Sequence, residues 1–166
     1  MSARMVSAMA AMVLVCVLLS IAGQSAAQAA PVDPALLAKA NSGDAAAQVR
    51  VGESFEQAAA AEPIRARIAS DYRQAAAWYR KAADQGYVGA QGTLGMLYSL
   101  GLGVPQSDAE AYFWLDLAAS VKGPNQARYA ANRQNVGANI TIDQLQDVQD
   151  RVAAWQAAHP PPHPVH

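Results

Sequence analysis

The sequence predicts an all-α protein, a short α/α solenoid of superhelical helix–turn–helix repeats with capping helices at both ends. Apolar residues recur at intervals of three and four along successive segments, which is typical of helices with one buried face. The pattern also returns at a fixed distance, since Trp114 lies 36 residues after Trp78. A period in the thirties is typical of stacked helical repeats. The many alanines fit this arrangement, because small side chains let neighbouring helices approach closely.

The clearest helix pair is centred on Gly86. Its first helix carries Trp78 and Tyr79 among alanines at three- and four-residue intervals, and its second helix carries Leu94 and Tyr98 one turn apart. Glycine readily adopts the left-handed conformation that closes a helix C-terminus, so Gly86 predicts the turn between the two helices. Each helix has one apolar face, and a pair of helices cannot bury both faces alone. We therefore expect further helices on both sides.

Neighbouring segments repeat the same pair. Residues 47–55 align with residues 90–98, and residues 111–119 align with residues 75–83. We expect the aligned aromatic, aliphatic and glycine positions to hold the repeats together through packing. These positions are Val51, Gly52, Phe55, Trp78, Tyr79, Leu94, Gly95, Tyr98 and Trp114.

Two of these residues, Gly52 and Gly95, lie inside helical patterns. Glycine inside a helix costs ~1 kcal/mol relative to alanine. Its recurrence at one repeat position predicts that two helices approach each other closely there. This is a packing role and does not indicate a binding site.

The earlier repeat contains seven extra residues after its first helix, within the segment 58–70. Pro63 should end any helix that runs into this segment. We expect an extended loop that packs Ile64 and Ile68 on the core. The alternative is a small amphipathic turn with two nearby arginines, because insertions in repeat proteins often lie on a binding face.

Residues 1–30 predict a signal peptide, and therefore a periplasmic or secreted protein. A basic residue precedes an apolar core at residues 9–22, and small residues follow, with cleavage expected near Ala29 or Ala30. The alternative of an uncleaved anchor is disfavoured, because the core is shorter than the ~20 residues that a spanning helix needs. Lipid attachment at Cys16 is disfavoured by its apolar neighbours. Removal of the peptide would leave no cysteine, and hence no disulfide or thiolate site.

Capping helices are predicted at both ends of the repeats. Asp33 can cap a short helix that begins at Pro34. Thr141 and Gln144 form a capping box at the start of the last helix. The expected plan is a signal peptide at 1–30, a repeat domain at 31–158 with repeat halves at 44–58 and 71–86, a fuller repeat at 87–120, capping helices at 124–158, and a disordered Pro/His-rich tail at 159–166.

The repeated unit resembles the Sel-one-like repeat, a relative of the tetratricopeptide repeat. Residues 89–120 carry its pattern almost completely, in AQGTLGMLYSLGLGVPQSDAEAYFWLDLAAS. Residues 71–86 carry the second half of the preceding unit, and residues 47–55 carry the first half more weakly. The resemblance covers about half of the chain. It implies an α/α superhelix, and it implies an adaptor in signalling or assembly, with several bacterial examples in the periplasm or cell envelope.

The sequence carries no recognisable motif for catalysis, a cofactor or a metal. Its formal net charge of −1 lacks the basic excess that nucleic-acid binding needs. Three other groups of residues could carry a function, but we favour a structural interpretation of each. The three aspartates of the last helix form a solvated helix face, the three histidines lie in a disordered tail, and the three tryptophans pack between helices. Their functional alternatives are an acid–base pair among Asp143, Asp147 and Asp150, a metal site of His159, His163 and His166, and a carbohydrate groove lined by Trp78, Trp114 and Trp155. We expect no enzymatic activity, no cofactor, no metal and no stable membrane insertion after cleavage.

The sequence therefore favours a non-enzymatic adaptor that binds a partner protein or peptide on the concave face of the repeats, which is formed largely by the first helix of each pair. The candidate contact residues are Arg50, Glu53, Ser54, Gln57, Thr93, Met96 and Leu100. One alternative is an envelope regulator of a peptidoglycan-processing enzyme or a sensor. The other is a β-lactamase-like hydrolase, which the resemblance disfavours here because the mature chain would lack the paired cysteines of such members.

Overall fold

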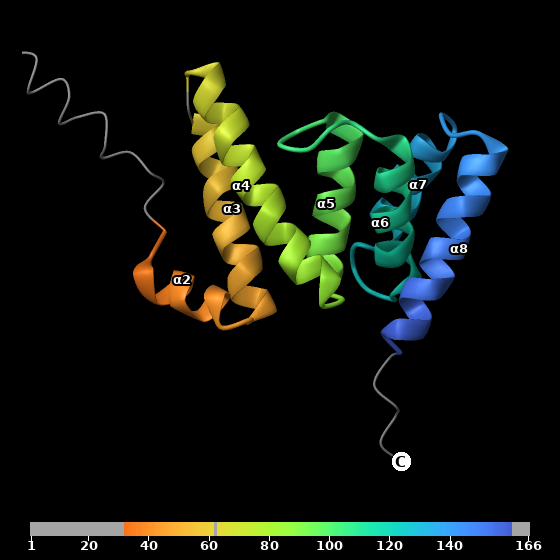
Figure 1. The fold of residues 1–166 in the computed structure, drawn as a ribbon, viewed down its shortest axis with the longest axis horizontal. Helices are drawn as coiled ribbons and strands as arrows, with labels where there is room; N and C mark the ends of the chain where they lie inside the picture. The colour runs from red at the N-terminus through yellow and green to blue at the C-terminus, as the bar shows by residue number, and fades with distance from the viewer. Residues whose placement is uncertain (1–31, 62, 161–166) are drawn as a thin grey trace, which may run out of the picture. The chain divides into compact units, whose positions relative to one another are not determined.

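The structure is a computed structural model that describes residues 32–61 and 63–160, and this part of the chain contains seven helices and no strand (Figure 1). The helices are α2 (Pro34–Asn41), α3 (Ala45–Ala61), α4 (Arg65–Asp84), α5 (Val88–Leu100), α6 (Asp108–Ser120), α7 (Gln126–Gly137) and α8 (Ile142–Ala158). The signal peptide predicted for residues 1–30 lies outside the described residues, as do residues 161–166 of the predicted tail.

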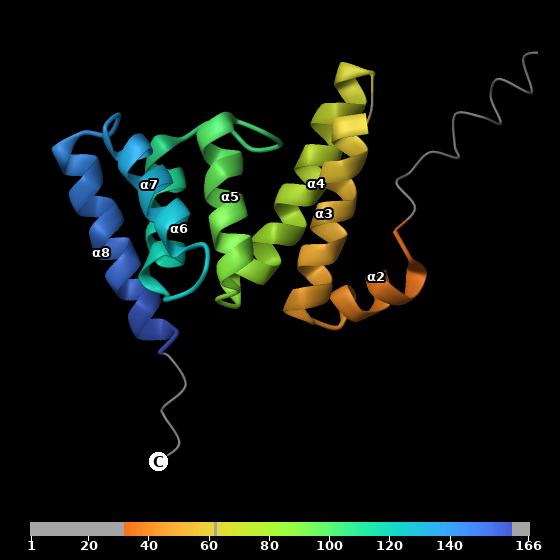
Figure 2. The same cartoon turned by 180° about the vertical axis from the view of Figure 1, so that it is seen from behind.

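The helices pack largely in chain order. Each of α2 to α6 contacts the next helix, and α6 also contacts α8. Figure 2 shows α5 between α4 and α6 when this part of the chain is viewed from behind. Pairs α3–α4 and α5–α6 are the two helix–turn–helix units expected from the sequence. The predicted all-α solenoid is confirmed.

Short local contacts set the helix ends. The Asp33 side chain accepts a hydrogen bond from the Ala35 amide (2.8 Å) at the start of α2. The Thr141 hydroxyl accepts one from the Gln144 amide, and the Gln144 side chain accepts one from the Thr141 amide, which completes the capping box of α8. Gly86 has a φ of +83° in the turn between α4 and α5. Each of these ends was predicted from the sequence, and each prediction is confirmed.

The extra residues of the first repeat lengthen two helices, so the expected loop at residues 58–70 is wrong. Helix α3 runs on to Ala61, and α4 begins at Arg65, which leaves only a short connection at Pro63. Ile64 is 52% exposed and therefore does not pack on the core. The four alanines at residues 58–61 favour helix before the proline, because alanine has the highest intrinsic helix propensity, and the arginines and alanines that follow it are also good helix formers. The α3–α4 hairpin is therefore longer than the α5–α6 hairpin, as Figure 1 shows.

Close helix approach occurs at both glycines that the repeat alignment singled out. A Cβ atom on Gly52 would lie 3.0 Å from Tyr79 Cε1, and one on Gly95 would lie 2.7 Å from Leu115 Cγ. Tyr79 and Leu115 occupy equivalent positions in α4 and α6, so the two hairpins use the same packing contact. Both glycines therefore lie where two helices approach each other closely. The Tyr79 hydroxyl donates to Glu56 Oε2 (2.8 Å), and burial, together with this bond, raises the pKa of Tyr79.

A glutamine contact joins each first helix to the helix before it. The Nε2 groups of Gln48 and Gln91 donate to backbone carbonyls eight residues earlier, those of Ala40 (3.1 Å) and Ala83 (3.3 Å). Gln126 donates to the carbonyl of Ala119 (3.1 Å) in the same way at the start of α7. These carbonyls belong to the last turns of α2, α4 and α6, where the amide four residues on does not continue the helix. The carbonyls of Ala40 and Ala83 also accept from the turn amides of Gly43 (3.2 Å) and Gly86 (2.9 Å). The third contact gives α7 the same attachment as the first helices of the two hairpins.

Replacing Gln91 with alanine should lower the free energy of unfolding by about 1–3 kcal/mol, because the packing of a buried side chain and its hydrogen bond to the Ala83 carbonyl would be lost, although that carbonyl keeps the bond from the Gly86 amide (2.9 Å). Gln91 is only 2% exposed. Urea unfolding followed by circular dichroism measures the change. The matched control is Gln126→Ala, at a half-buried position where water can replace the amide, and it should cost less than about 1 kcal/mol. Equal losses for the two variants would contradict the argument.

Three arginines tie neighbouring helices together through aromatic and polar contacts. Arg80 of α4 donates to the Tyr98 hydroxyl (2.6 Å) and lies over the Trp114 ring, with its Cζ 4.9 Å from the centroid. Arg133 of α7 pairs with Asp116, and Arg151 of α8 pairs with Glu110 (2.6 Å); both partners lie on α6. These three arginine side chains therefore stabilise the packing between helices.

Candidate binding site

The predicted contact residues on α3 form an exposed polar stripe. Arg50, Glu53 and Gln57 lie at helical spacing and are exposed. Within the described residues, their side chains form no hydrogen bond or ion pair. Ser54 is half-buried, and its hydroxyl donates to the Arg50 carbonyl (2.9 Å). The α3 stripe, defined as Arg50, Glu53 and Gln57, is therefore available to another molecule.

The predicted contact residues on α5 are less accessible, because α7 packs beside them. Thr93 and Met96 are half-buried, and the Met96 sulfur lies 3.1 Å from Asn132 Nδ2 of α7. Leu100, the last residue of α5, is 58% exposed. The structure therefore does not present the seven residues as one uniform surface: α3 and the end of α5 are open, and the middle of α5 is partly covered.

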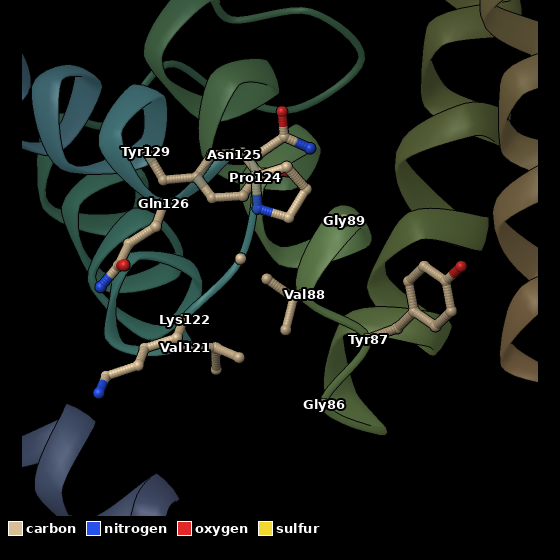
Figure 3. Close-up of a pocket in the computed structure, with 11 residues that line it drawn as sticks. Gly86, Tyr87, Val88, Gly89, Val121, Lys122, Pro124, Asn125, Gln126 and Tyr129 are labelled. Carbon is tan, nitrogen blue, oxygen red and sulfur yellow. The ribbon is translucent and has the colours of Figure 1, made fainter.

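A first cavity, of about 530 Å³, lies between the N-terminal ends of α5 and α7 (Figure 3). The start of α5 contributes Val88, and the segment between α6 and α7 contributes Val121, which is 46% exposed. Lys122 is the one lining residue with a formal charge at neutral pH. The full lining is Gly86, Tyr87, Val88, Gly89, Val121, Lys122, Gly123, Pro124, Asn125, Gln126 and Tyr129.

A second cavity, of about 810 Å³, lies where the C-terminal ends of α4, α6 and α8 meet. The Trp155 ring lies in its wall and stacks on the His159 ring, with centroids 4.1 Å apart and an interplanar angle of 14°. Gly86, Val88 and Val121 line both cavities, so the two cavities are adjacent. The second cavity is lined by Gln85, Gly86, Val88, Gln91, Leu117, Ser120, Val121, Trp155, Gln156, His159 and Pro160. We call the two adjacent cavities together the turn groove.

Sequence reasoning missed the turn groove, because its residues come from three chain segments far apart in the sequence. Val121 and Trp155 fall at the ends of different helices, and no repeat position relates them. One signal was available in the apolar Val121, which stands in a turn where polar residues are usual. Of the three tryptophans considered for a carbohydrate groove, Trp155 alone lines either part of the turn groove.

The environment of Asp84, beside the second cavity, disfavours the ionised form of its carboxyl group. Partial burial raises the pKa of Asp84, and the charges of Arg80 and His159 oppose this effect. Asp84 is also the last residue of α4, where the negative end of the helix dipole disfavours a carboxylate. The folded state therefore holds the Asp84 proton more tightly than the unfolded state does.

Replacing Asp84 with asparagine should raise stability at neutral pH, by about 0.3–1 kcal/mol and nearer the lower value because the carboxyl is partly solvated. Because the pKa of Asp84 is higher in the folded state than in the unfolded state, the protonated carboxyl stabilises the fold at pH values below its unfolded-state pKa. This stabilisation is lost as the pH rises through the folded-state pKa. The gain over the parent chain should therefore vanish near pH 3 in urea unfolding. Asp143→Asn, in the first turn of α8, is the control and should lower stability at neutral pH. A gain for Asp84→Asn that persists at pH 3 would contradict the argument.

The described residues contain no arrangement that indicates metal chemistry or membrane insertion. Within residues 32–61 and 63–160, no three side chains of histidine, cysteine, aspartate or glutamate come together as a metal site would require. Asp143, Asp147 and Asp150 are exposed along α8. Among the described helices, none combines the length and the hydropathy that crossing a bilayer requires. His163 and His166 lie outside the described residues.

Comparison with known proteins finds a repeat family and a solved structure to which the chain is similar. Residues 45–87 and 90–120 match the family model of the Sel1 repeat, and proteins with this repeat are generally protein-interaction scaffolds. Among solved structures, the chain is similar to a protective antigen present in uropathogenic Escherichia coli strains, which displays an SLR fold. The TM-score is 0.61 and the identity 30%, and the match covers 74% of this chain. It covers 24% of the antigen, so this chain spans about a quarter of that protein. No curated protein matches the chain.

Proposed function

Since the chain carries two Sel1 repeats in an SLR fold, we propose that it is a non-enzymatic adaptor of the bacterial periplasm or cell envelope that binds a protein or peptide partner. The predicted signal peptide supports the location. The partner would contact the α3 stripe and the exposed Leu100 at the end of α5. An envelope regulator of a peptidoglycan-processing enzyme or a sensor is a special case of this proposal, in which the partner is that enzyme or sensor.

One observation carries the proposal: the charged residues of the α3 stripe are not used within the fold. Arg80, Arg133 and Arg151 each bind a partner on a neighbouring helix. The side chains of Arg50 and Glu53, by contrast, are exposed and form no hydrogen bond or ion pair among the described residues. Exposed charges can select a partner and steer its approach at no cost to the packing of the fold.

Site-specific photo-crosslinking in cells tests the binding face. The whole chain would be expressed in a Gram-negative host with p-benzoyl-phenylalanine in place of Gln57, and adducts would be detected with antibodies against the purified protein. We expect one defined adduct at Gln57. The matched control carries the photoreactive residue in place of Gln149, an exposed position on α8. Adducts of equal strength at both positions, or none at Gln57, would reject the α3 stripe as the binding face.

Export is tested separately in the same cells. Intact-mass analysis of the periplasmic fraction should give a species that begins near Ala30. An unprocessed chain in the membrane fraction would reject the proposed location. A processed chain without an adduct would reject the binding face and leave export supported.

The non-enzymatic part of the proposal also has a direct test. The purified protein should hydrolyse nitrocefin, a chromogenic β-lactam, no faster than buffer does. Turnover proportional to protein concentration would instead support the hydrolase alternative.

A further inference from the structure

Helix α7 occupies the place of the first helix of a third repeat. Its residue Gln126 binds the end of α6 just as Gln91 binds the end of α4 and Gln48 binds the end of α2. In the two complete hairpins, α4 packs closely along α3, and α6 packs closely along α5. Helix α8, which follows α7 in the chain, instead packs on α6 and makes at most slight contact with α7. Among the described helices, none therefore covers α7 as the second helix of its own hairpin.

The glutamine contacts show which residue of α7 faces the uncovered side. Gln126 aligns with Gln91, so Ala130 aligns with Gly95. Gly95 is buried, and a Cβ atom on it would lie 2.7 Å from Leu115 Cγ of the second helix, α6. Ala130 is only half-buried. Ala130 therefore lies at the position where the α5–α6 hairpin binds its second helix.

A cavity of about 540 Å³ lies on this side of α7. All of its lining residues belong to α7, apart from one tyrosine of α6. The lining is Tyr112, Ala127, Ala130, Ala131, Arg133 and Gln134, and we call it the α7 groove. Small side chains on one helix allow another helix to approach it closely, so the three alanines suit the groove to a helical ligand.

The charges of α7 indicate the chemistry of such a ligand. Arg133 is the one charged residue of the groove lining, and α7 contains no aspartate or glutamate. The pairing of Arg133 with Asp116 of α6 shows that a carboxylate can reach it from a neighbouring helix. Arg128 is exposed and forms no ion pair within the described residues. Pairing α7 with the α7 of a second copy would bring arginines together, so charge favours an acidic helix from a different protein.

We propose that the α7 groove binds an acidic, amphipathic helix of a partner protein. This helix packs along α7 as α6 packs along α5, and it places a large apolar side chain against Ala130 where α6 places Leu115 against Gly95. Carboxylates on its flank lie toward the arginines of α7. The α7 groove is a second binding surface, on a different helix from the α3 stripe.

The test uses the sequence of α6 as the probe, because α6 already packs in this way against α5. A synthetic peptide of residues 107–120 contains three acidic residues. A hydrocarbon staple between positions 109 and 113, on the helix side away from Leu115, keeps it helical. In a titration of ¹⁵N-labelled protein, the amides of Ala127, Ala130 and Ala131 should shift with a dissociation constant of about 0.1–1 mM. The amides of the α3 stripe should not shift.

Matched variants of the peptide and of the protein separate docking from general attraction between charges. The stapled peptide with Leu115→Asp lacks the apolar contact and should bind at least about tenfold more weakly. In the protein, Ala131→Glu places a carboxylate in the groove and should weaken binding of the unchanged peptide by at least about tenfold. Ala153→Glu, at an exposed alanine of α8, is the control and should leave the binding unchanged.

Three results would overturn the proposal. The first is the absence of saturable shifts at α7 with a peptide whose helicity circular dichroism confirms. The second is equal binding of the Leu115→Asp peptide, which would leave only attraction between charges. The third is a set of α7 shifts that depend on the concentration of the protein alone, which would identify a second copy as the ligand. None of these results bears on the α3 stripe, so crosslinking at Gln57 remains a separate test of the proposed function.

Discussion

Replacing Trp114 with alanine should lower the free energy of unfolding by about 3–5 kcal/mol. The side chain is 2% exposed, belongs to the core cluster that joins α4, α5, α6 and α8, and packs edge-on against Phe113. Its loss would leave a cavity between helices and would remove the ring beneath the Arg80 guanidinium. Total stabilities of single domains are only about 5–15 kcal/mol, so a loss of this size removes a large part of the whole. Urea unfolding monitored by circular dichroism measures it.

Two further variants separate the causes of this loss. Trp78 occupies the equivalent repeat position but is half-buried, with the Lys81 ammonium 3.8 Å from its ring centroid, so Trp78→Ala should cost about 1–2 kcal/mol. Trp114→Phe keeps an aromatic ring and should cost less than Trp114→Ala. It breaks no hydrogen bond within the described residues, because the Trp114 indole Nε1–H forms none there. If Trp78→Ala and Trp114→Ala lowered the free energy of unfolding equally, the repeat position of a tryptophan, and not its burial, would determine its contribution to stability.

Replacing Gly103 with alanine should destabilise the protein by about 2–4 kcal/mol. Gly103 has a φ of +72°, and a Cβ atom there would lie 2.2 Å from the carbonyl carbon and oxygen of Tyr72 in α4. The clash is with helix backbone and cannot be relieved by rotating a side chain. The loop between α5 and α6 would therefore have to move away from α4. Thermal unfolding should show a loss of roughly 10 °C.

Two other glycines isolate the two parts of this effect. Gly43 has a φ of +100°, but a Cβ atom there would meet no other described atom within 4 Å, so Gly43→Ala should cost only the strain, about 1 kcal/mol. Gly123 has neither a positive φ nor a close neighbour among the described residues, and Gly123→Ala should change stability by less than about 0.5 kcal/mol. If Gly43→Ala were as damaging as Gly103→Ala, the contact with Tyr72 would have no energetic role.

The fold was predictable because it depends on local periodicity and on recurrence along the chain. Helical spacing identified the apolar faces, and the alignment of Gly52 with Gly95 indicated close packing before any contact was known. The length of the first hairpin was not predictable in this way. Alignment with the shorter repeat shows that residues have been inserted, but helix propensity decides whether they form a loop or extend the flanking helices.

The binding residues were predictable only in part, for a related reason. Repeat alignment identifies the positions on each first helix that face away from the core, which are Arg50, Glu53 and Gln57 on α3. It does not show that α7 approaches α5 closely, with a Cβ on Gly92 placed 2.1 Å from Tyr129 Cε1, and so covers the neighbourhood of Met96. The turn groove depends on tertiary contacts among three segments without a shared pattern, and sequence periodicity holds no information on such contacts.

The long α3–α4 hairpin offers a practical site for protein engineering. The connection at Pro63 lies at the end of this hairpin, where Ala60, Ala61 and Ile64 are exposed. The residues by which this hairpin exceeds the shorter one are additions to a complete repeat. An epitope, fluorophore or small reporter domain could be spliced in after Ala61 without altering the glutamine contacts or the turn groove. Exposed loop tips are where inserted sequences are best tolerated. Such a chain would be a labelled reagent that keeps the proposed binding face intact.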